Sequence, residues 1–252
     1  MKNFKAKLSK IGEHLLNIMY PKHIKCIFCG EELTEKAYND TCVDCWKTLP
    51  FVERPCLRCG GSVEEVQGNV CLTCHKLNHN FVSARAVFDY TDMIVGLVHK
   101  FKYNNKSFLF EPMSNFMTEK LSTWGIEPDI ITFVPLHKNK QKSRSFNQAE
   151  LLAKSIAEKF DIKCIGLCEK IVDNYSQASL NFKDRQENVK DAYKFINRHK
   201  QEVKNKIILL IDDIMTTGAT ADEISKVLLN AGAKEIYVLN FAHRSLFEET
   251  KK

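Results

Sequence analysis

ILLIDDIMTTGAT, residues 208–220, combines a short apolar run, two adjacent acids and a turn rich in threonine. Four apolar residues, Ile208 to Ile211, predict a buried strand with the acids at its carboxyl end. The segment from Ala221 to Ala233 then has apolar residues at helical spacing, with Ile224 and Leu228 on one face. The sequence therefore predicts a strand, a tight turn and a helix in direct succession.

That order suits the binding of a phosphate ester. Backbone N–H groups and threonine hydroxyls converge at the start of a helix, where the helix dipole favours an anion, and Gly218 allows the backbone to come close. Asp212 and Asp213 cannot bind that phosphate, but carboxylates accept hydrogen bonds from sugar hydroxyls or hold Mg²⁺. Phosphate and a diol together describe a ribose 5-phosphate. A nucleotide-binding P-loop fits less well because no Gly-Lys-Ser/Thr follows the turn, and a buried strand that ends in acids by chance is the structural alternative.

The bulk composition is that of an ordinary globular protein. The chain has 252 residues, 44% of them hydrophobic and 27% charged, and a net charge of +6. This basic excess permits contact with nucleic acid or phosphorylated ligands without demanding it. No apolar run approaches the ~20 residues of a membrane-spanning helix, and no secretory signal is convincing. We therefore expect a cytoplasmic protein with reduced cysteines, and an amphipathic N-terminal helix over residues 1–25.

Eight of the 10 cysteines form C-x-x-C pairs near the start of the chain. The pairs are Cys26 and Cys29, Cys42 and Cys45, Cys56 and Cys59, and Cys71 and Cys74. Two such pairs close a tetrahedral four-thiolate site, so four pairs predict two structural zinc ions in a small cysteine-rich domain over residues 26–80. A disulfide framework, iron–sulfur ligation and a c-type haem motif at residues 71–75 fit less well. Spacing favours sequential sites but leaves a cross-braced pairing open.

The rest of the chain alternates between strand and helix patterns. Strands are expected at 84–90 and 129–134, and helices at 92–103, 109–124 and 146–160. This alternation continues to Phe241 and predicts an α/β domain over residues 81–245, in which helices cover both faces of a parallel sheet. Ligands bind beyond the carboxyl ends of the strands in such sheets, so residues 135–137 and 212–220 are expected to share one crevice.

Two polar patches accompany this crevice. The first runs from Val134 to Lys138 and continues at 142–149, KSRSFNQA, which places cationic groups between a strand and a helix. The second includes Gln177, Leu180 and the run RQENV at 185–189. Each patch taken alone is typical of a solvated loop.

The signature at 208–220 resembles that of type I phosphoribosyltransferases. Together with the cysteine pairs and the two patches, residues 26–243 are similar to the ComF/GntX family, which joins a double zinc ribbon to a phosphoribosyltransferase-like domain. The resemblance implies that Asp212 and Asp213 bind the ribose hydroxyls and act in catalysis with Arg144. It also implies a substrate site made by Thr216, Thr217, Gly218, Ala219, Thr220, Pro135, Leu136, His137 and Lys102. Ser145 departs from the family, which has glycine there.

The resemblance also implies a function. We expect a protein that binds phosphoribosyl pyrophosphate with Mg²⁺ and acts in DNA uptake, together with single-stranded DNA and an ATP-dependent DNA helicase. The alternatives are a nucleobase-salvage phosphoribosyltransferase with structural zinc ribbons and a zinc-ribbon adaptor with a vestigial pocket. The sequence specifies neither an acceptor nucleophile nor whether catalysis is retained.

Overall fold

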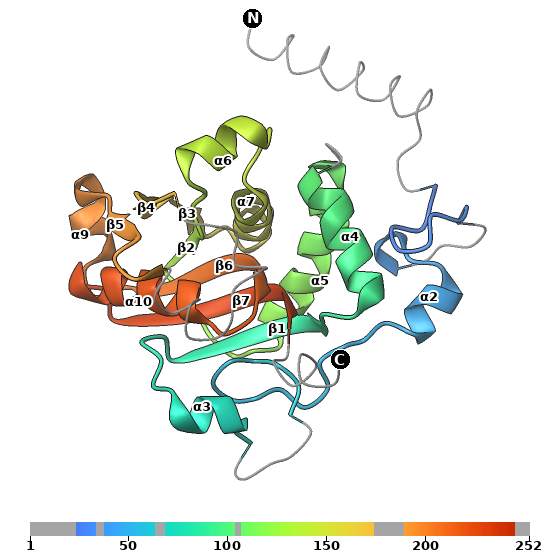
Figure 1. Ribbon diagram of the computed structural model, residues 1–252, viewed down its shortest axis with the longest axis horizontal. Helices are drawn as coiled ribbons and strands as arrows, with labels where there is room; N and C mark the ends of the chain where they lie inside the picture. Colours follow the sequence, from blue (N-terminus) through green and yellow to red (C-terminus); the bar gives the residue numbers. More distant parts are fainter. Residues whose placement is uncertain (1–23, 34–37, 64–68, 104–106, 174–188, 245–252) are drawn as a thin grey trace, which may run out of the picture. The chain divides into compact units, whose positions relative to one another are not determined.

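The computed structural model describes residues 24–33, 38–63, 69–103, 107–173 and 189–244 (Figure 1). The chain divides into two compact units, residues 1–49 and 50–252. Of the helix predicted over 1–25, residues 1–23 lie outside the described part, and Lys25 forms an isolated β-bridge with Glu32. The sequence-based domain limits at 26–80 and 81–245 stay predictions. Among the helices of the described residues, none is long and apolar enough to span a bilayer.

The first unit is small in its described part. It contains a 3₁₀ turn, η1 (Tyr38–Asp40), and one short helix, α2 (Val43–Lys47). Cys42 is the N-cap of α2, and its side chain accepts a bond from the backbone of Cys45. Such a short helix has little stability of its own, so contacts such as the cap by the Cys42 side chain are needed to stabilise it.

A five-stranded parallel sheet forms the centre of the second unit. Its strand order is β1-β7-β6-β2-β3. Residues Ile208 to Ile211 are fully buried, as expected for a central strand covered on both faces. The strands are β1 (Ser83–Asp89), β2 (Ile130–Phe133), β3 (Lys163–Cys164), β6 (Ile207–Met215) and β7 (Glu235–His243).

Helices cover both faces of this sheet, as predicted. Helices α5 (Phe110–Ser122) and α7 (Gln148–Phe160) pack together and contact β1, β7, β2 and β6. Helix α10 (Ala219–Asn230) connects β6 to β7, whereas α7 connects β2 to β3 in the opposite direction along the sheet. Since parallel crossovers are right-handed, helices on connections that run in opposite directions lie on opposite faces. The α/β fold class is confirmed.

The remaining helices surround the carboxyl ends of the strands or their flanks. Helix α4 follows β1 directly, and α6 follows β2 and precedes α7. Their bounds, with those of the shorter turns, are α4 (Asp92–Tyr103), η2 (Ser107–Leu109), α6 (Lys138–Ser143), η4 (Asn197–His199), α9 (Lys200–Val203) and α3 (Leu72–Lys76).

Two details differ from the sequence-based expectation. Strand β6 does not end at Ile211 but continues through the acids to Met215, because β7 runs alongside it and pairs Asp212 with Asn240 and Met215 with His243. In addition, β4 (Cys168–Lys170) and β5 (Tyr193–Phe195) form a separate antiparallel pair that the simple alternation did not predict. Both differences arise from pairing between distant segments, which has no local signal.

Candidate active site

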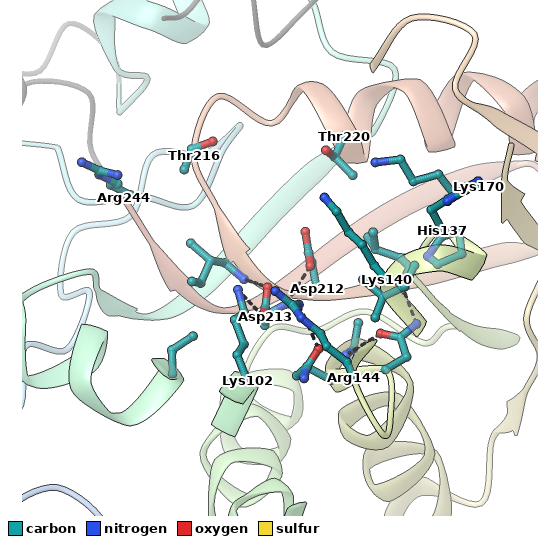
Figure 2. Close-up of a pocket in the computed structure, with 18 of the residues that line it drawn as sticks. Lys102, His137, Lys140, Arg144, Lys170, Asp212, Asp213, Thr216, Thr220 and Arg244 are labelled. Atoms are coloured by element: carbon teal, nitrogen blue, oxygen red, sulfur yellow. Dashed lines mark hydrogen bonds and ion pairs between the residues drawn. The ribbon is translucent and has the colours of Figure 1, made fainter. Parts of the chain in front are cut away.

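A cavity of about 420 Å³ lies at the carboxyl ends of β2 and β6 (Figure 2). It brings together residues 135–137 and members of the 212–220 segment, which were expected to share one crevice. The second polar patch, at Gln177, Leu180 and 185–188, lies outside the described residues. Nine of the predicted site residues line it: Lys102, Pro135, Leu136, His137, Arg144, Asp212, Asp213, Thr216 and Thr220. Thr217, Gly218 and Ala219 belong to the same turn but are not among the lining residues. The adjacent strand ends of a parallel sheet explain why residues so distant in sequence meet here.

The two acids of this cavity are held by their own strand and by Lys102. Asp212 accepts a hydrogen bond from the backbone N of Asp213 at 2.8 Å, and Asp213 accepts one from the backbone N of Ile214 at the same distance. Lys102 Nζ, at the end of α4, lies 2.6 Å from Asp213 Oδ2. The acids therefore face a lysine ammonium across the cavity.

Burial and neighbouring charges change the pKa values of Asp212 and Lys102. Burial and the charge of Asp213 raise the pKa of Asp212 well above its usual range. Burial by itself lowers the pKa of Lys102, but the carboxylates of Asp213 and Asp212 outweigh it and raise that pKa. The protonated form of Asp212 is therefore favoured more than in a free aspartic acid, and a cation at this position would favour its ionised form. The raised pKa of Lys102 favours its charged form.

The turn after β6 offers free backbone donors. Gly218 has φ 76°, a left-handed conformation that glycine adopts without strain, and it is the N-cap of α10. Thr217 is buried, and its Oγ1 accepts a hydrogen bond from the N of Ala219 at 3.2 Å. Within the described residues, the backbone N–H groups of Thr216, Thr217 and Gly218 have no acceptor. Three N–H groups at a helix N-terminus make a site for an anion.

The segment between α6 and α7 positions Arg144 at the cavity. Asn147 is buried and holds this segment in two ways: its Nδ2 donates to Val134 O at 3.0 Å, and its Oδ1 accepts from Ala149 N at 3.1 Å as the cap of α7. Arg144 Nη1 lies 3.4 Å from Gln148 Oε1. Asn147 therefore fixes the strand end, the helix start and the arginine loop relative to one another.

Gln148 is a cavity residue that the sequence-based site omitted. Its side chain is buried, and within the described part of the chain its Nε2 has no hydrogen-bond partner. A buried amide without a partner costs free energy unless a ligand or water satisfies it. The position of Gln148 in the predicted loop motif was the available signal, but only the cavity shows that its amide is unsatisfied.

Further basic side chains line the cavity. Figure 2 shows His137, Lys140 and Lys170 on the side of Thr220, whereas Arg244 lies beyond Thr216. Lys170 lies over the ring of Tyr193, with Nζ 5.6 Å from the ring centroid. The site predicted from the sequence did not include Lys140, Lys170, Tyr193 or Arg244, which also line the cavity. Clustered cations in a partly enclosed cavity favour a ligand with several negative charges.

His137 is tied to the loop after β4. Its Nδ1 lies 3.3 Å from Asp173 Oδ1, and Asn139 Nδ2 donates to Asp173 Oδ2 at 2.6 Å. The hydrogen bond from Asn139 and the charge of His137 lower the pKa of Asp173. Two loops that follow different strands are therefore joined at the cavity mouth.

The eight paired cysteines form two separate groups. Cys26, Cys29, Cys42 and Cys45 make one, and Cys56, Cys59, Cys71 and Cys74 make the other, with the Sγ atoms of each group within 4.8 Å of one another. The structure thus has the sequential grouping, not the cross-braced one. Cys164 and Cys168 lie outside both groups.

The geometry of both groups suits zinc. The Sγ atoms of Cys29 and Cys42 are 3.7 Å apart, and those of Cys59 and Cys71 are 3.8 Å apart. Four sulfurs at about 2.3 Å from a tetrahedral ion lie about 3.8 Å from one another. Although burial raises the pKa of Cys26, backbone N–H donors such as that of Cys42 lower it to about 7, which favours the thiolate that a metal needs.

Two solved structures are similar to about half of this chain. A glutamine phosphoribosylpyrophosphate amidotransferase from B. subtilis is 20% identical with a TM-score of 0.37, and the match covers 52% of this chain and 26% of that one. An adenine phosphoribosyltransferase from Thermoanaerobacter pseudethanolicus is 12% identical with a TM-score of 0.35, over 56% of this chain and 83% of that one.

Among curated proteins, the matches cover most of the chain. "Competence protein F" of Haemophilus influenzae is 28% identical over 87% of this chain and 97% of its own length. "Competence protein ComFC" of Streptococcus pneumoniae is 27% identical over 84% of this chain and 97% of its own length. "DNA utilization protein YhgH" of Escherichia coli is 28% identical over 60% of this chain and 68% of its own length.

Two family models match successive parts of the chain. One describes a double zinc ribbon domain and matches residues 15–75, which contain all eight paired cysteines. The other describes a phosphoribosyl transferase domain and matches residues 147–246, which contain the acid pair and the threonine turn. The comparisons confirm the resemblance to the ComF/GntX family: this chain joins a double zinc ribbon to a phosphoribosyl transferase domain.

Proposed function

We propose that the cavity binds phosphoribosyl pyrophosphate together with Mg²⁺. The observation that carries this proposal is the meeting of Asp212 and Asp213 with a turn of free backbone N–H groups in one cavity. The turn offers donors for a 5-phosphate, and the carboxylates offer acceptors for the two ribose hydroxyls. A ribose 5-phosphate carries both an anion and a diol on one small ring.

Each remaining group has a role in this proposal. Arg144 lines the cavity and provides positive charge for the pyrophosphate, and His137 lines the cavity with it. Lys138 follows His137 in the chain, and Lys102 pairs with Asp213. Gln148 gains an acceptor for its buried amide. Carboxylate oxygens of Asp212 and Asp213 suit Mg²⁺, which when bound would neutralise the leaving group.

The proposed reaction is displacement at the anomeric carbon. A nitrogen nucleophile forms the new C–N bond, the C–O bond to pyrophosphate breaks with its electron pair, and the proton of the nucleophile passes to solvent. Positive charge develops on the ribose before the new bond is complete. The residues of this chain contribute by orienting the two ends of the ligand and by stabilising charge, with no covalent step.

The cellular role that we propose is DNA uptake. The curated relatives with competence and DNA-utilization names motivate it, and the net charge of +6 is compatible with nucleic acid. Single-stranded DNA and an ATP-dependent helicase are the proposed partners, in the cytoplasm.

A screen for pyrophosphate release tests the proposed chemistry. Wild-type protein, Mg²⁺ and phosphoribosyl pyrophosphate are incubated with nucleobases, amines or DNA ends as acceptors. We expect release with one acceptor class and its loss in Asp212→Asn/Asp213→Asn, with Asp161→Asn at the end of α7 as the matched control. If the double variant still releases pyrophosphate, the proposed role of Asp212 and Asp213 is refuted. If pyrophosphate is released only with nucleobases, the result favours the salvage enzyme.

A further inference from the structure

The segment after the second cysteine group, residues 77–82, connects that group to the threonine turn. We call it the 77–82 strap. His79 Nε2 lies 3.7 Å from the Sγ of Cys74, and His79 Nδ1 lies 3.7 Å from Asp222 Oδ1 in the first turn of α10. The side chain of His79 is 4% exposed. One buried ring thus lies between a cysteine of the second group and the helix that the turn begins.

The same strap supports the turn by packing. The rings of His79 and Phe81 are stacked, with centroids 4.5 Å apart and planes 13° from parallel. A Cβ placed on Gly218 would lie 3.3 Å from Cε1 of His79 and 3.6 Å from Cζ of Phe81. A Cβ at position 218 would make a tight contact with His79 and an ordinary one with Phe81, so both rings pack against the left-handed turn.

Asn80 fixes a charge that would otherwise oppose an anion. Asp222 accepts a hydrogen bond from Asn80 N at 2.5 Å and another from Asn80 Nδ2 at 3.0 Å. Asp222 lies in the first turn of α10, so its negative charge is close to the N–H groups that would hold a phosphate. A carboxylate there competes with a bound anion for the positive end of the helix. Asn80 binds both carboxylate oxygens and so holds this charge on the strap.

The cysteine group fixes the start of the strap. Cys74 lies in the short helix α3, and the strap begins at Leu77, whose N donates to Thr73 O at 3.1 Å. A five-residue helix does not persist on its own. Four thiolates bound to zinc hold it in place, since the spacing of the second group fits that ion.

We propose that His79 and Asn80 are positioning residues that couple zinc in the second cysteine group to anion binding at the turn of residues 216–220. The coupling rests on the proposed function, because it concerns the same phosphate site. Loss of zinc releases the strap, and with it the support of Gly218 and the restraint on Asp222. Thermodynamic coupling is reciprocal, so a phosphate ligand in the turn must also tighten the binding of zinc by the second group, and we expect this tighter binding to appear as slower release.

Zinc release to a chromogenic chelator tests this directly. The first cysteine group belongs to the other unit, so zinc release from it is the internal control. The variant Cys29→Ser/Cys42→Ser, which removes two ligands of the first group, identifies which kinetic phase belongs to that group. We expect two kinetic phases in the wild type. Mg²⁺ with phosphoribosyl pyrophosphate should slow the second-group phase about 5- to 20-fold, within the usual range of coupled sites, and leave the first-group phase unchanged. Equal rates without the ligand and at a ligand concentration that calorimetry shows to saturate the cavity would overturn the coupling.

Variants separate positioning from general stability. In Asn80→Ala and Asp222→Ala the ligand should no longer slow zinc release, whereas His79→Gln, which keeps an N–H donor, should retain part of the effect. Asn115→Ala, which removes another asparagine contact on α5, is the matched control and should keep the full effect. If the ligand also fails to slow zinc release in Asn115→Ala, the slowing reports only the overall stability of the protein. That result would overturn the role of the strap.

A ligand-free measurement distinguishes failure of the coupling from failure of the proposed function. Hydrogen exchange of the backbone N–H groups at residues 216–222 is followed before and after zinc is removed by chelation. Faster exchange at residues 216–222 after zinc is removed, with an unchanged exchange rate in α7, supports the coupling. This holds even if calorimetry detects no binding of phosphoribosyl pyrophosphate. Unchanged exchange at the turn overturns it, whatever ligand the cavity binds.

Discussion

At the scale of single residues, the proton on Asp212 is the most specific consequence of the site. Burial and Asp213 raise its pKa, so the folded state holds this proton more tightly than the unfolded chain. The resulting contribution to stability is fully present below the unfolded-state pKa of about 3.9, and it is lost as the pH rises through the folded-state value. Since Mg²⁺ requires the ionised acid, binding of the metal and its ligand should release a proton at a pH below the raised pKa of Asp212.

Calorimetry in two buffers measures that proton. The heat of binding of Mg²⁺ and phosphoribosyl pyrophosphate should differ between PIPES and Tris by the ionisation enthalpies of the buffers. Asp212→Asn should remove the difference, and Asp161→Asn should keep it. Identical heats for the wild type in both buffers would contradict an acid that is protonated in the empty cavity.

Gln148 permits a test in which stability and binding change differently. Because its buried Nε2 has no partner among the described residues, Gln148→Met should leave the free energy of unfolding within about 1 kcal/mol or raise it. The same substitution should weaken ligand binding about 10- to 100-fold, the loss expected for one hydrogen bond to a charged group. Unfolding in urea and ligand titration measure the two effects. Strong destabilisation with unchanged affinity would mean that Gln148 is only a core residue.

At the scale of elements, the two cysteine groups provide a matched pair of glycines. Gly30 and Gly60 have φ 84° and 73°, and each N donates to the first cysteine of its own group at 2.9 Å. A Cβ on Gly30 would meet nothing within 4 Å, whereas on Gly60 it would lie 2.6 Å from Ala84 O in β1. Both alanine variants incur about 1–2 kcal/mol for the left-handed backbone, and Gly60→Ala should lose a further ~1–3 kcal/mol. Equal losses in urea unfolding would contradict close packing of the second group on β1.

The elements also show what the sequence could predict. The helix expected over 92–103 has those bounds, because Ile94, Leu97, Val98 and Phe101 repeat at helical spacing and are all buried. The antiparallel pair of β4 and β5 was not predicted, since each strand has three residues and its partner is remote in sequence. The cavity was predicted from two motifs at strand ends, but Lys170, Tyr193 and Arg244 carry no motif and meet only in the folded chain.

At the scale of the whole molecule, zinc content and DNA binding are the main expectations. Elemental analysis should find about two zinc ions per chain, because both cysteine groups have tetrahedral spacing. One or none would require a different role for one group.

Binding of single-stranded DNA, if it uses the basic excess of the chain, should weaken as salt increases, with a linear decrease of log K against log salt concentration. A mobility-shift series between 50 and 200 mM salt, as is usual for such titrations, measures that slope. Salt-independent binding, or no shift at low salt, would remove DNA from the proposed partners.

The most direct measurement is a calorimetric titration of the wild-type protein with phosphoribosyl pyrophosphate and Mg²⁺, alongside Asp212→Asn/Asp213→Asn. The account predicts saturable binding at one site per chain, and a reduction of about 10- to 100-fold in the double variant, because charged hydrogen-bond partners of the ribose are lost. No heat with the wild type, or equal affinity in the double variant, would contradict a ribose phosphate held between the acid pair and the threonine turn.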